Sequence, residues 1–191
     1  MPVTPFHFGP GALIKALMPG GFSWTVFALA NVLIDLEPIG LFVFTGDPAH
    51  PWLHTLPGAL LVATAAVAGR PLCEAWLRFW NRRLSAPQAR WLGVVPGITA
   101  VQAWAGALLG TLSHLALDAL MHPDVRPLWP FVPDNPWRGA VALDVLHWSC
   151  IAAGVVALVF GVVKSVRERS DDALASPCPW GWPHILLMSH S

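Results

Sequence analysis

Charged side chains are scarce in this sequence. Only 12% of its 191 residues are Asp, Glu, Lys or Arg, whereas 55% are hydrophobic. A disordered chain has the opposite balance, and an ordinary soluble domain carries about a quarter charged residues, so both classes are disfavoured. The composition therefore predicts a membrane protein.

Tyrosine is absent, cysteine is rare and the formal net charge is zero. Eleven tryptophans suit a membrane protein, because indoles favour the bilayer interface. Cys73, Cys150 and Cys178 form no C-x-x-C pair and no disulfide framework, so we expect them to serve packing. The zero net charge offers no basic surface to nucleic acid. The first residues lack the pattern of a cleavable signal, so we expect them in the mature protein.

Four apolar runs predict an all-α, polytopic membrane protein. They are Phe22 to about Ile34, Leu53–Ala68, about Val95–Met121 and Ala140–Val163. The last two exceed the roughly 20 residues that cross a hydrocarbon core, and the second would cross if extended at its ends. We expect three membrane helices in one membrane-embedded domain over residues 1–169, then a poorly ordered tail over 170–191.

A shorter helical stretch, about Pro10–Met18, precedes the first run and ends at a Pro-Gly-Gly breaker. Two short helices with a tight turn predict a re-entrant hairpin, which is permitted where protein covers the backbone. Its open ends would carry His7 and Asp35 on the same side. The alternative is a single crossing helix from near Phe22, which would put His7 on the opposite side.

Basic residues indicate the orientation. Residues 70–91 contain five arginines and apolar residues at helical spacing, which predicts an amphipathic helix in the cytoplasmic interface. Lys164, Arg167 and Arg169 follow the fourth run and place the C-terminus on the cytoplasmic side. The polar residues at the opposite ends of the helices then face the non-cytoplasmic side: Asp35, Glu37, His50, His54, His114, Asp118, His122, Asp144 and His147.

The third run carries His114, Asp118 and His122 at intervals of four residues, which stacks them on one helix face. Two ionisable residues buried in an apolar helix need each other or a metal, and imidazole and carboxylate are usual zinc ligands. His50 and His54 repeat the spacing in HPWLH. The sequence therefore predicts a metal site at the non-cytoplasmic ends of the helices.

Each residue also has a purely structural interpretation. His54 or His147 alone is typical of a hydrogen-bonded core histidine. Asp144 lies in the first turn of its helix, where the helix dipole favours a carboxylate. His122 precedes a proline and is consistent with a helix end.

The motif order resembles that of the YdjM-like inner-membrane metal-dependent hydrolases. The segments TPFH, NVLIDLEP, HPWLHTLPGALL and GTLSHLALDAL, followed by RPLWPF, resemble an early His, Pro-Asp-x-Asp, His-Arg-x-x-Thr-His, and Ser-His-x-x-x-Asp with its Leu-x-x-Pro loop. The resemblance covers about residues 4–131. Glu37 replaces the second aspartate, and the histidine element lacks its arginine, so an anionic substrate would need Arg126 or Arg138 instead.

That family is itself similar to the zinc-dependent phospholipase C and P1 nuclease group of all-helical phosphoesterases. The resemblance implies a bacterial inner-membrane protein that hydrolyses a phosphoester or phospholipid at the outer surface of the membrane. It implies Zn²⁺, as one ion or more, with these ligands: His7, Asp35, His54, His114 and Asp118. It places Asp35, His50 and His122 closest to catalysis, with Asp144 and His147 as further candidates.

Two other functions use the same residues. A non-catalytic metal-binding or metal-transporting membrane protein would use the same ligands, although transport favours a path from both sides. A haem-binding bundle would use His54, His114 or His147 as axial ligands. The sequence leaves the substrate and the oligomeric state open.

Overall fold

The computed structural model describes residues 5–46, 49–86, 88–89 and 93–175, and this part of the chain contains helices but no strands. The helices are α1 (Pro5–Leu17), α2 (Trp24–Ile34), α3 (Leu36–Thr45), α4 (Leu56–Ala68), α5 (Arg70–Arg83), α7 (Ala100–Met121) and α8 (Leu143–Ala175). The predicted all-α class is confirmed.

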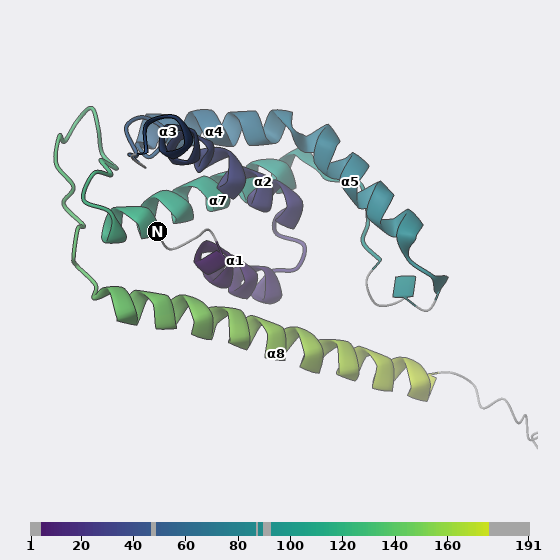
Figure 1. Ribbon diagram of the computed structural model, residues 1–191. Helices are drawn as coiled ribbons and strands as arrows, with labels where there is room; N and C mark the ends of the chain where they lie inside the picture. Colours follow the sequence, from purple (N-terminus) through teal and green to yellow (C-terminus); the bar gives the residue numbers. More distant parts are fainter. Residues whose placement is uncertain (1–4, 47–48, 87, 90–92, 176–191) are drawn as a thin grey trace, which may run out of the picture.

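Helix α7 lies at the centre of the fold (Figure 1). It packs against α2 and α4, whereas α8 packs almost entirely against α1. A Cβ atom on Gly106 of α7 would lie 2.5 Å from the carbonyl oxygen of Ser23, so the helix backbones meet closely there. Small residues permit such contacts, which hold helices together where lipid removes the hydrophobic driving force.

The α1–α2 pair has the two short helices and tight turn expected of the N-terminal segment. The turn is closed by the Lys15 ammonium group, which donates to the carbonyls of Pro19 and Phe22. Helix α1 starts at Pro5 rather than near Pro10, so Pro10 lies inside the helix and His7 occupies its first turn. Reading Pro10 as a helix start was wrong by about one turn.

Helix α3 lies in the stretch between Asp35 and His54, for which the sequence analysis predicted no helix. It begins at Leu36, directly after a break at Asp35, and ends at Thr45, followed by the capping Gly46, whose φ of 78° is left-handed. Pro38 lies in its first turn, where a missing N–H costs no intrahelical bond. Pro38 is therefore compatible with the helix.

Three stretches of the described chain are long and apolar enough to cross a membrane, namely Trp24–Thr45, Ala100–Met121 and Leu143–Arg167. Helix α4 has 13 residues and reaches such a length only together with α5, across a bend of 50°. The predicted membrane helix over Leu53–Ala68 corresponds to α4, whereas the third candidate span of the structure is α2–α3. The coarse prediction of a protein with several membrane helices agrees with this count.

Two further boundaries differ from the prediction. The amphipathic helix α5 ends at Arg83, short of residue 91. Helix α8 continues to Ala175, so the first six residues of the expected tail are helical. The remainder of that tail, residues 176–191, lies outside the described residues.

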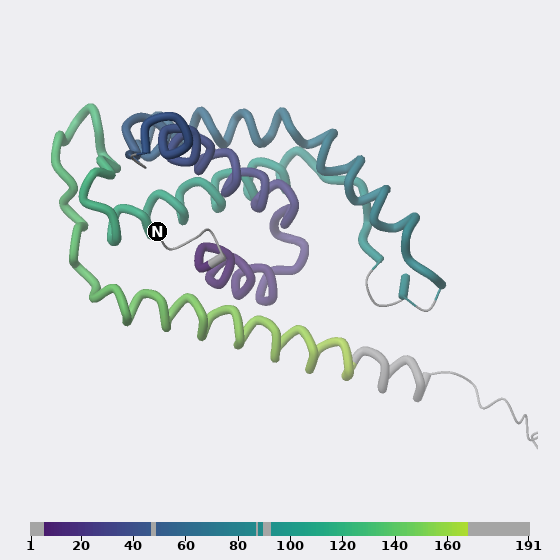
Figure 2. Tube along the Cα trace, in the orientation of Figure 1, coloured from purple at the N-terminus to yellow at the C-terminus, as the bar shows by residue number. Residues whose placement is uncertain are grey.

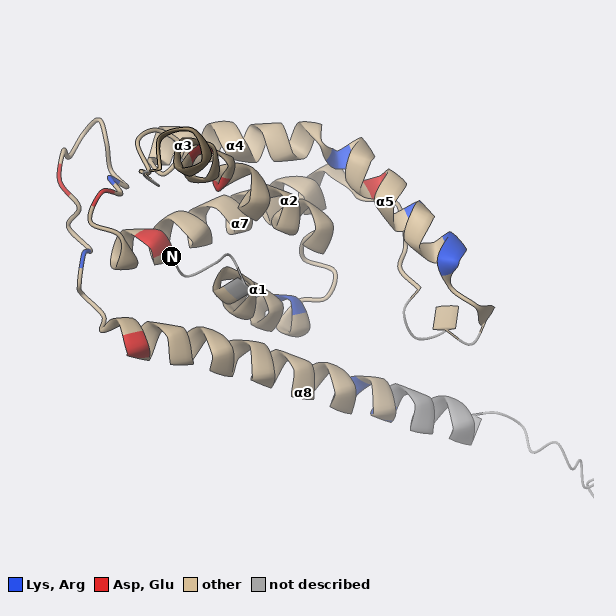
Figure 3. Ribbon diagram, viewed as in Figure 1, with Lys and Arg blue, Asp and Glu red and all other residues tan. Residues whose placement is uncertain are grey.

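One end of the molecule gathers the ends of many helices. The starts of α1, α4 and α8 and the ends of α2 and α7 lie toward the same side in Figure 2. We call it the histidine end, because it carries His7, His54 and His122. In Figure 3 the acidic residues lie mostly at this end and the basic residues of α1, α5 and α8 mostly at the other.

Candidate metal centre

Four residues from three parts of the chain form what we call the inner group. Asp35 lies at the break between α2 and α3, and His54 precedes Thr55, which caps α4. His114 and Asp118 are one turn apart on α7. One ligand atom from each of these four residues lies within 4.8 Å of the others, so the group could hold a metal ion.

The distances within the inner group match those between the ligands of one ion. Nε2 of His114 lies 3.1 Å from Oδ1 of Asp35 and 3.2 Å from Oδ2 of Asp118. Nε2 of His54 lies 3.1 Å from Oδ2 of Asp118 and 3.9 Å from Oδ1 of Asp35. Ligand atoms bonded to a tetrahedral zinc ion at about 2.0–2.1 Å lie roughly 3.3 Å apart.

The inner group also has the chemistry of a cation site. Nε2 of His54 and Nε2 of His114 are buried and make no hydrogen bond, although both face carboxylate oxygens. Neutral imidazoles beside two carboxylates leave buried negative charge, which is costly unless it is paired. A divalent cation neutralises that charge, so the residues fit the zinc that the sequence predicts.

Asn31 on α2 fixes the orientation of His114. Its side-chain amide donates to the carbonyl of Phe27 at 2.9 Å. Its Oδ1 lies 3.1 Å from Nδ1 of His114 and therefore accepts the imidazole proton. This leaves Nε2 of His114 unprotonated and facing the carboxylates, as metal binding requires.

Asp118 also belongs to a second set, the outer group, with His50 and His122. Its Oδ1 lies 4.0 Å from Nε2 of His122, whereas its Oδ2 faces the inner group. The rings of His50 and His122 stack with centroids 4.7 Å apart. The Asp118 carboxylate therefore offers one oxygen to each group.

Asp124 orients His50 in the outer group. Its Oδ2 accepts from the backbone N–H and from Nδ1 of His50, each at 2.8 Å. A proton on Nδ1 leaves Nε2 free to bind a metal. Burial alone would raise the pKa of Asp124, but the hydrogen bonds from His50, its nearby charge and a backbone hydrogen bond together outweigh the burial and lower that pKa.

His7 approaches the centre through Asp118. Its Nε2 lies 3.2 Å from Oδ1 of Asp118, and its ring stacks on that of His114 with centroids 4.0 Å apart. Both ring nitrogens of His7 are buried without a hydrogen bond. His7 belongs to neither the inner nor the outer group. It lies beside the candidate centre, next to Oδ1 of Asp118.

The environment keeps two of these histidines neutral. Burial lowers the pKa of His54 and of His122, because desolvation disfavours the imidazolium form. Neutral imidazole is the form that binds a metal.

Three residues that the sequence offered as site candidates lie outside the inner and outer groups. Glu37 accepts the backbone N–H groups of Trp52 and Leu53, so it supports the loop that carries His50 and His54. Asp144 is exposed at the start of α8, and the His147 ring lies tilted against the ring of Phe6, with centroids 4.7 Å apart. None of the three belongs to either metal-ligand group among the described residues.

Sequence reasoning missed Asn31 and Asp124. Asn31 is the one amide in an otherwise apolar α2, and this isolation was the available signal. Asp124 lies two residues after His122 in a loop, where an aspartate is common and carries no signal of its own.

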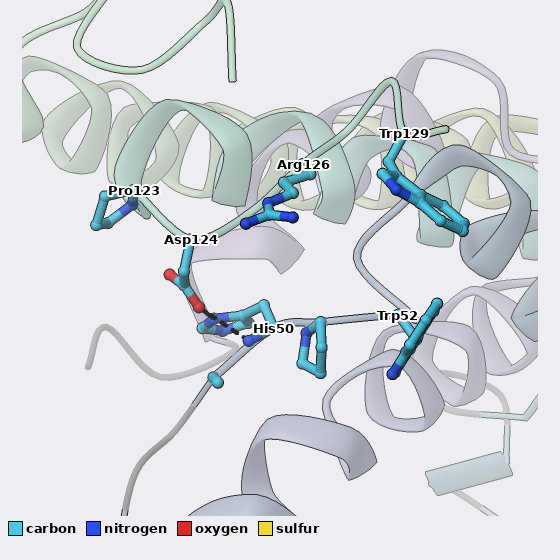
Figure 4. A pocket seen from close by; sticks show the side chains of 8 residues that line it. His50, Trp52, Pro123, Asp124, Arg126 and Trp129 are labelled. Atoms are coloured by element: carbon cyan, nitrogen blue, oxygen red, sulfur yellow. Dashed lines mark hydrogen bonds and ion pairs between the residues drawn. The ribbon is translucent and has the colours of Figure 1, made fainter. Parts of the chain in front are cut away.

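A cleft of about 350 Å³ opens beside the outer group (Figure 4). His50, Asp124 and Arg126 line it on one side, and Trp52 and Trp129 line it on the other. Arg138, the second arginine considered from the sequence, is exposed and does not line it. The cleft therefore connects the outer group at the histidine end to the surface of the protein.

No known protein-family model, curated protein or solved structure matches this chain. The resemblance to the YdjM-like hydrolases stays a prediction. A function has to be argued from the geometry.

Proposed function

We propose that this protein is a membrane-embedded, metal-dependent hydrolase of phosphoesters, with zinc as its metal and its site at the non-cytoplasmic surface. The observation that carries the proposal is the position of Asp118. Its two oxygens face two adjacent groups of histidines, 3.1 Å from His54 on one side and 4.0 Å from His122 on the other. A shared carboxylate of this kind suits a centre with more than one ion.

The buried residues and the more accessible residues of the site would have different roles. His54 and His114 are fully buried and would hold the metal, while Asn31 keeps His114 in the correct tautomer. Zinc, when bound, lowers the pKa of water to about 7 and polarises a phosphoryl oxygen. Asp35 and His122 are the more accessible members, with side chains 16% and 22% exposed, so they would meet the water and the ester.

The membrane placement is supported by three candidate spans and by the distribution of charge. The basic residues of α5 and α8 lie away from the histidine end (Figure 3), and positive charge favours the cytoplasmic side. The histidine end would then face outward, with the C-terminus in the cytoplasm. Lipid phosphate esters are the substrates that can reach such a site laterally from the bilayer.

Transport and haem binding receive less support. Helix α4 has no ionisable residue beyond its start, so the described ligands form no path toward the other end. The rings of His54 and His114 have centroids only 5.4 Å apart and face carboxylates, which leaves no room for a porphyrin between them. A metal-binding protein without catalysis is the remaining alternative, and turnover distinguishes it from a hydrolase.

The first experiment measures metal content and hydrolysis together. Detergent-purified protein is analysed by elemental mass spectrometry, then tested on bis(p-nitrophenyl) phosphate and a fluorescent phospholipid before and after chelation. Asp134→Asn, a change at an exposed aspartate, is the control. We expect stoichiometric zinc and hydrolysis that chelation abolishes and added zinc restores. Protein without metal contradicts the proposal, and metal without hydrolysis indicates the non-catalytic alternative.

A further inference from the structure

We propose that Arg126 is the anion-binding residue of the cleft and holds a non-reacting phosphate oxygen of the ester. This inference rests on the proposed function, because it assigns a role within the same site. The cleft is lined by His50 of the outer group, and Arg126 projects into it toward the His50–Asp124 pair (Figure 4). A phosphate near the outer group therefore comes within reach of a fixed positive charge.

The guanidinium group of Arg126 is available for a ligand. It makes no ion pair or side-chain hydrogen bond with another residue of the described chain, and the residue is exposed. The nearby Asp124 is engaged instead by two hydrogen bonds from His50. Guanidinium binds phosphate oxygens through two parallel hydrogen bonds, so an unpaired arginine in such a cleft suits an anionic ligand.

The opposite wall of the cleft indicates where the rest of the ligand lies. Trp52 and Trp129 meet edge to face, with ring centroids 5.5 Å apart, and Trp52 is 61% exposed. Exposed indoles are typical of the headgroup level of a bilayer. The ligand class is therefore a phosphate ester whose anionic group meets Arg126 and whose organic group packs on these two rings.

Arg126 is a binding and positioning residue for this ester, and its effect is separable from metal binding. Arg126 belongs to neither ligand group and takes no part in the Asp124–His50 hydrogen bond, so we expect its removal to leave both in place. Loss of one charged hydrogen-bonding partner weakens anion binding by roughly 10-fold or more. The zinc content should not change.

The test compares wild type with Arg126→Gln, Arg126→Lys and the matched control Arg138→Gln. Zinc content is measured first, and then the affinity for inorganic phosphate by calorimetry. We expect equal zinc in all four proteins, a loss of phosphate affinity of roughly 10-fold or more in Arg126→Gln, a smaller loss in Arg126→Lys and none in Arg138→Gln. Equal affinity in wild type and Arg126→Gln overturns the proposal, and so does an equal loss in Arg138→Gln.

A second arm identifies the source of the phosphate. Competition with phosphatidic acid in vesicles is compared with competition by soluble glycerol phosphate. Stronger competition by the vesicles supports a lipid headgroup, and stronger competition by the soluble ester supports a free metabolite. The outcomes remain distinguishable from failure of the proposed function, because zinc content and hydrolysis by the wild type report on that function directly.

Discussion

Oδ1 of Asn31 accepts the Nδ1 proton of His114 across 3.1 Å, and so an amide on α2 determines which nitrogen of an α7 histidine faces Asp35 and Asp118. This hydrogen bond connects the packed helices α2 and α7 to the candidate metal centre. It is buried, and the amide is held in turn by the carbonyl of Phe27. Packing of α2 on α7 and metal affinity are therefore linked through one hydrogen bond.

Asn31→Leu should weaken zinc binding by roughly 10–100-fold, because the partner that orients a metal-binding histidine is lost. It should also lower stability by about 1–3 kcal/mol, since Nδ1 of His114 becomes a buried donor without an acceptor. Zinc affinity, measured by competition with a chelator, checks the first expectation, and thermal unfolding checks the loss of stability. Asn81→Leu, at a hydrogen-bonded asparagine far from the centre, should leave zinc affinity unchanged.

Asp118→Asn should remove zinc from both ligand groups at once. The change replaces the carboxylate whose oxygens face His54 and His7 at 3.1 and 3.2 Å. We expect at least a ~100-fold loss of affinity, beyond the effect of an orienting partner alone. Elemental mass spectrometry of the folded variant, beside Asp134→Asn, measures it. Zinc at the wild-type level in folded Asp118→Asn would show that Asp118 is not a ligand.

Gly9→Ala should loosen α1 from α8. A Cβ atom at Gly9 would lie 2.0 Å from the carbonyl oxygen of Cys150, so the helices must separate at a cost of about 1–3 kcal/mol. A Cβ atom at Gly161, also on α8, meets nothing within 4 Å, so Gly161→Ala is the control. Thermal unfolding in detergent should show a lower transition temperature for the first variant and no decrease for the second.

Glu37→Ala should displace the loop that carries His50 and His54. Its carboxylate accepts the N–H of Leu53 at 2.7 Å and that of Trp52 at 3.1 Å. Loss of these bonds should cost about 1–3 kcal/mol and weaken zinc binding, although Glu37 belongs to neither ligand group. Glu37→Gln keeps an acceptor oxygen and should retain more zinc. Equal zinc affinity in all three proteins would mean that the loop holds its position without Glu37.

Glu74 predicts a pH dependence at the opposite end of the fold. Hydrogen bonds from Arg70 and from the backbone N–H of Ile98 lower the pKa of Glu74. A lowered pKa in the folded state stabilises the protein above the unfolded value of roughly 4.3, and the effect is lost as the pH falls through the lower folded value. Wild type should therefore unfold at a higher temperature than Glu74→Gln at pH 7. The difference should disappear in acid, and a difference independent of pH would exclude this cause.

The local part of the site was predictable from the sequence. His114 and Asp118 lie on one helix face because their spacing matches the helical repeat, and this required no knowledge of tertiary structure. The structure brings Asp35 and His54 to the same place, as the motif order suggested. The partners of Asn31 and Asp124 were not predictable, because each acts on a histidine more than 70 residues away in the sequence.

The fold was predictable in class and less so in detail. The apolar runs predicted several helices long enough to cross a membrane, because hydrophobicity over about 20 residues is a strong signal of such a helix. Helix α3 was not predicted, because the predicted apolar run ends near Ile34, whereas the chain resumes a helix at Leu36 directly after the break at Asp35. The position of α1 was shifted because Pro10 resembles a helix start when its neighbours are unknown.

The enclosure of α1 between the central helices and α8 has a consequence for biosynthesis (Figure 1). Helix α1 is made first among the described helices, and the partner that covers its outer face, α8, is made last. Until α8 is synthesised, the surface of α1 around Gly9 lacks its contact with Cys150. Helix α1 carries His7, so we expect the position of His7 beside Asp118 to be fixed only after α8 is complete.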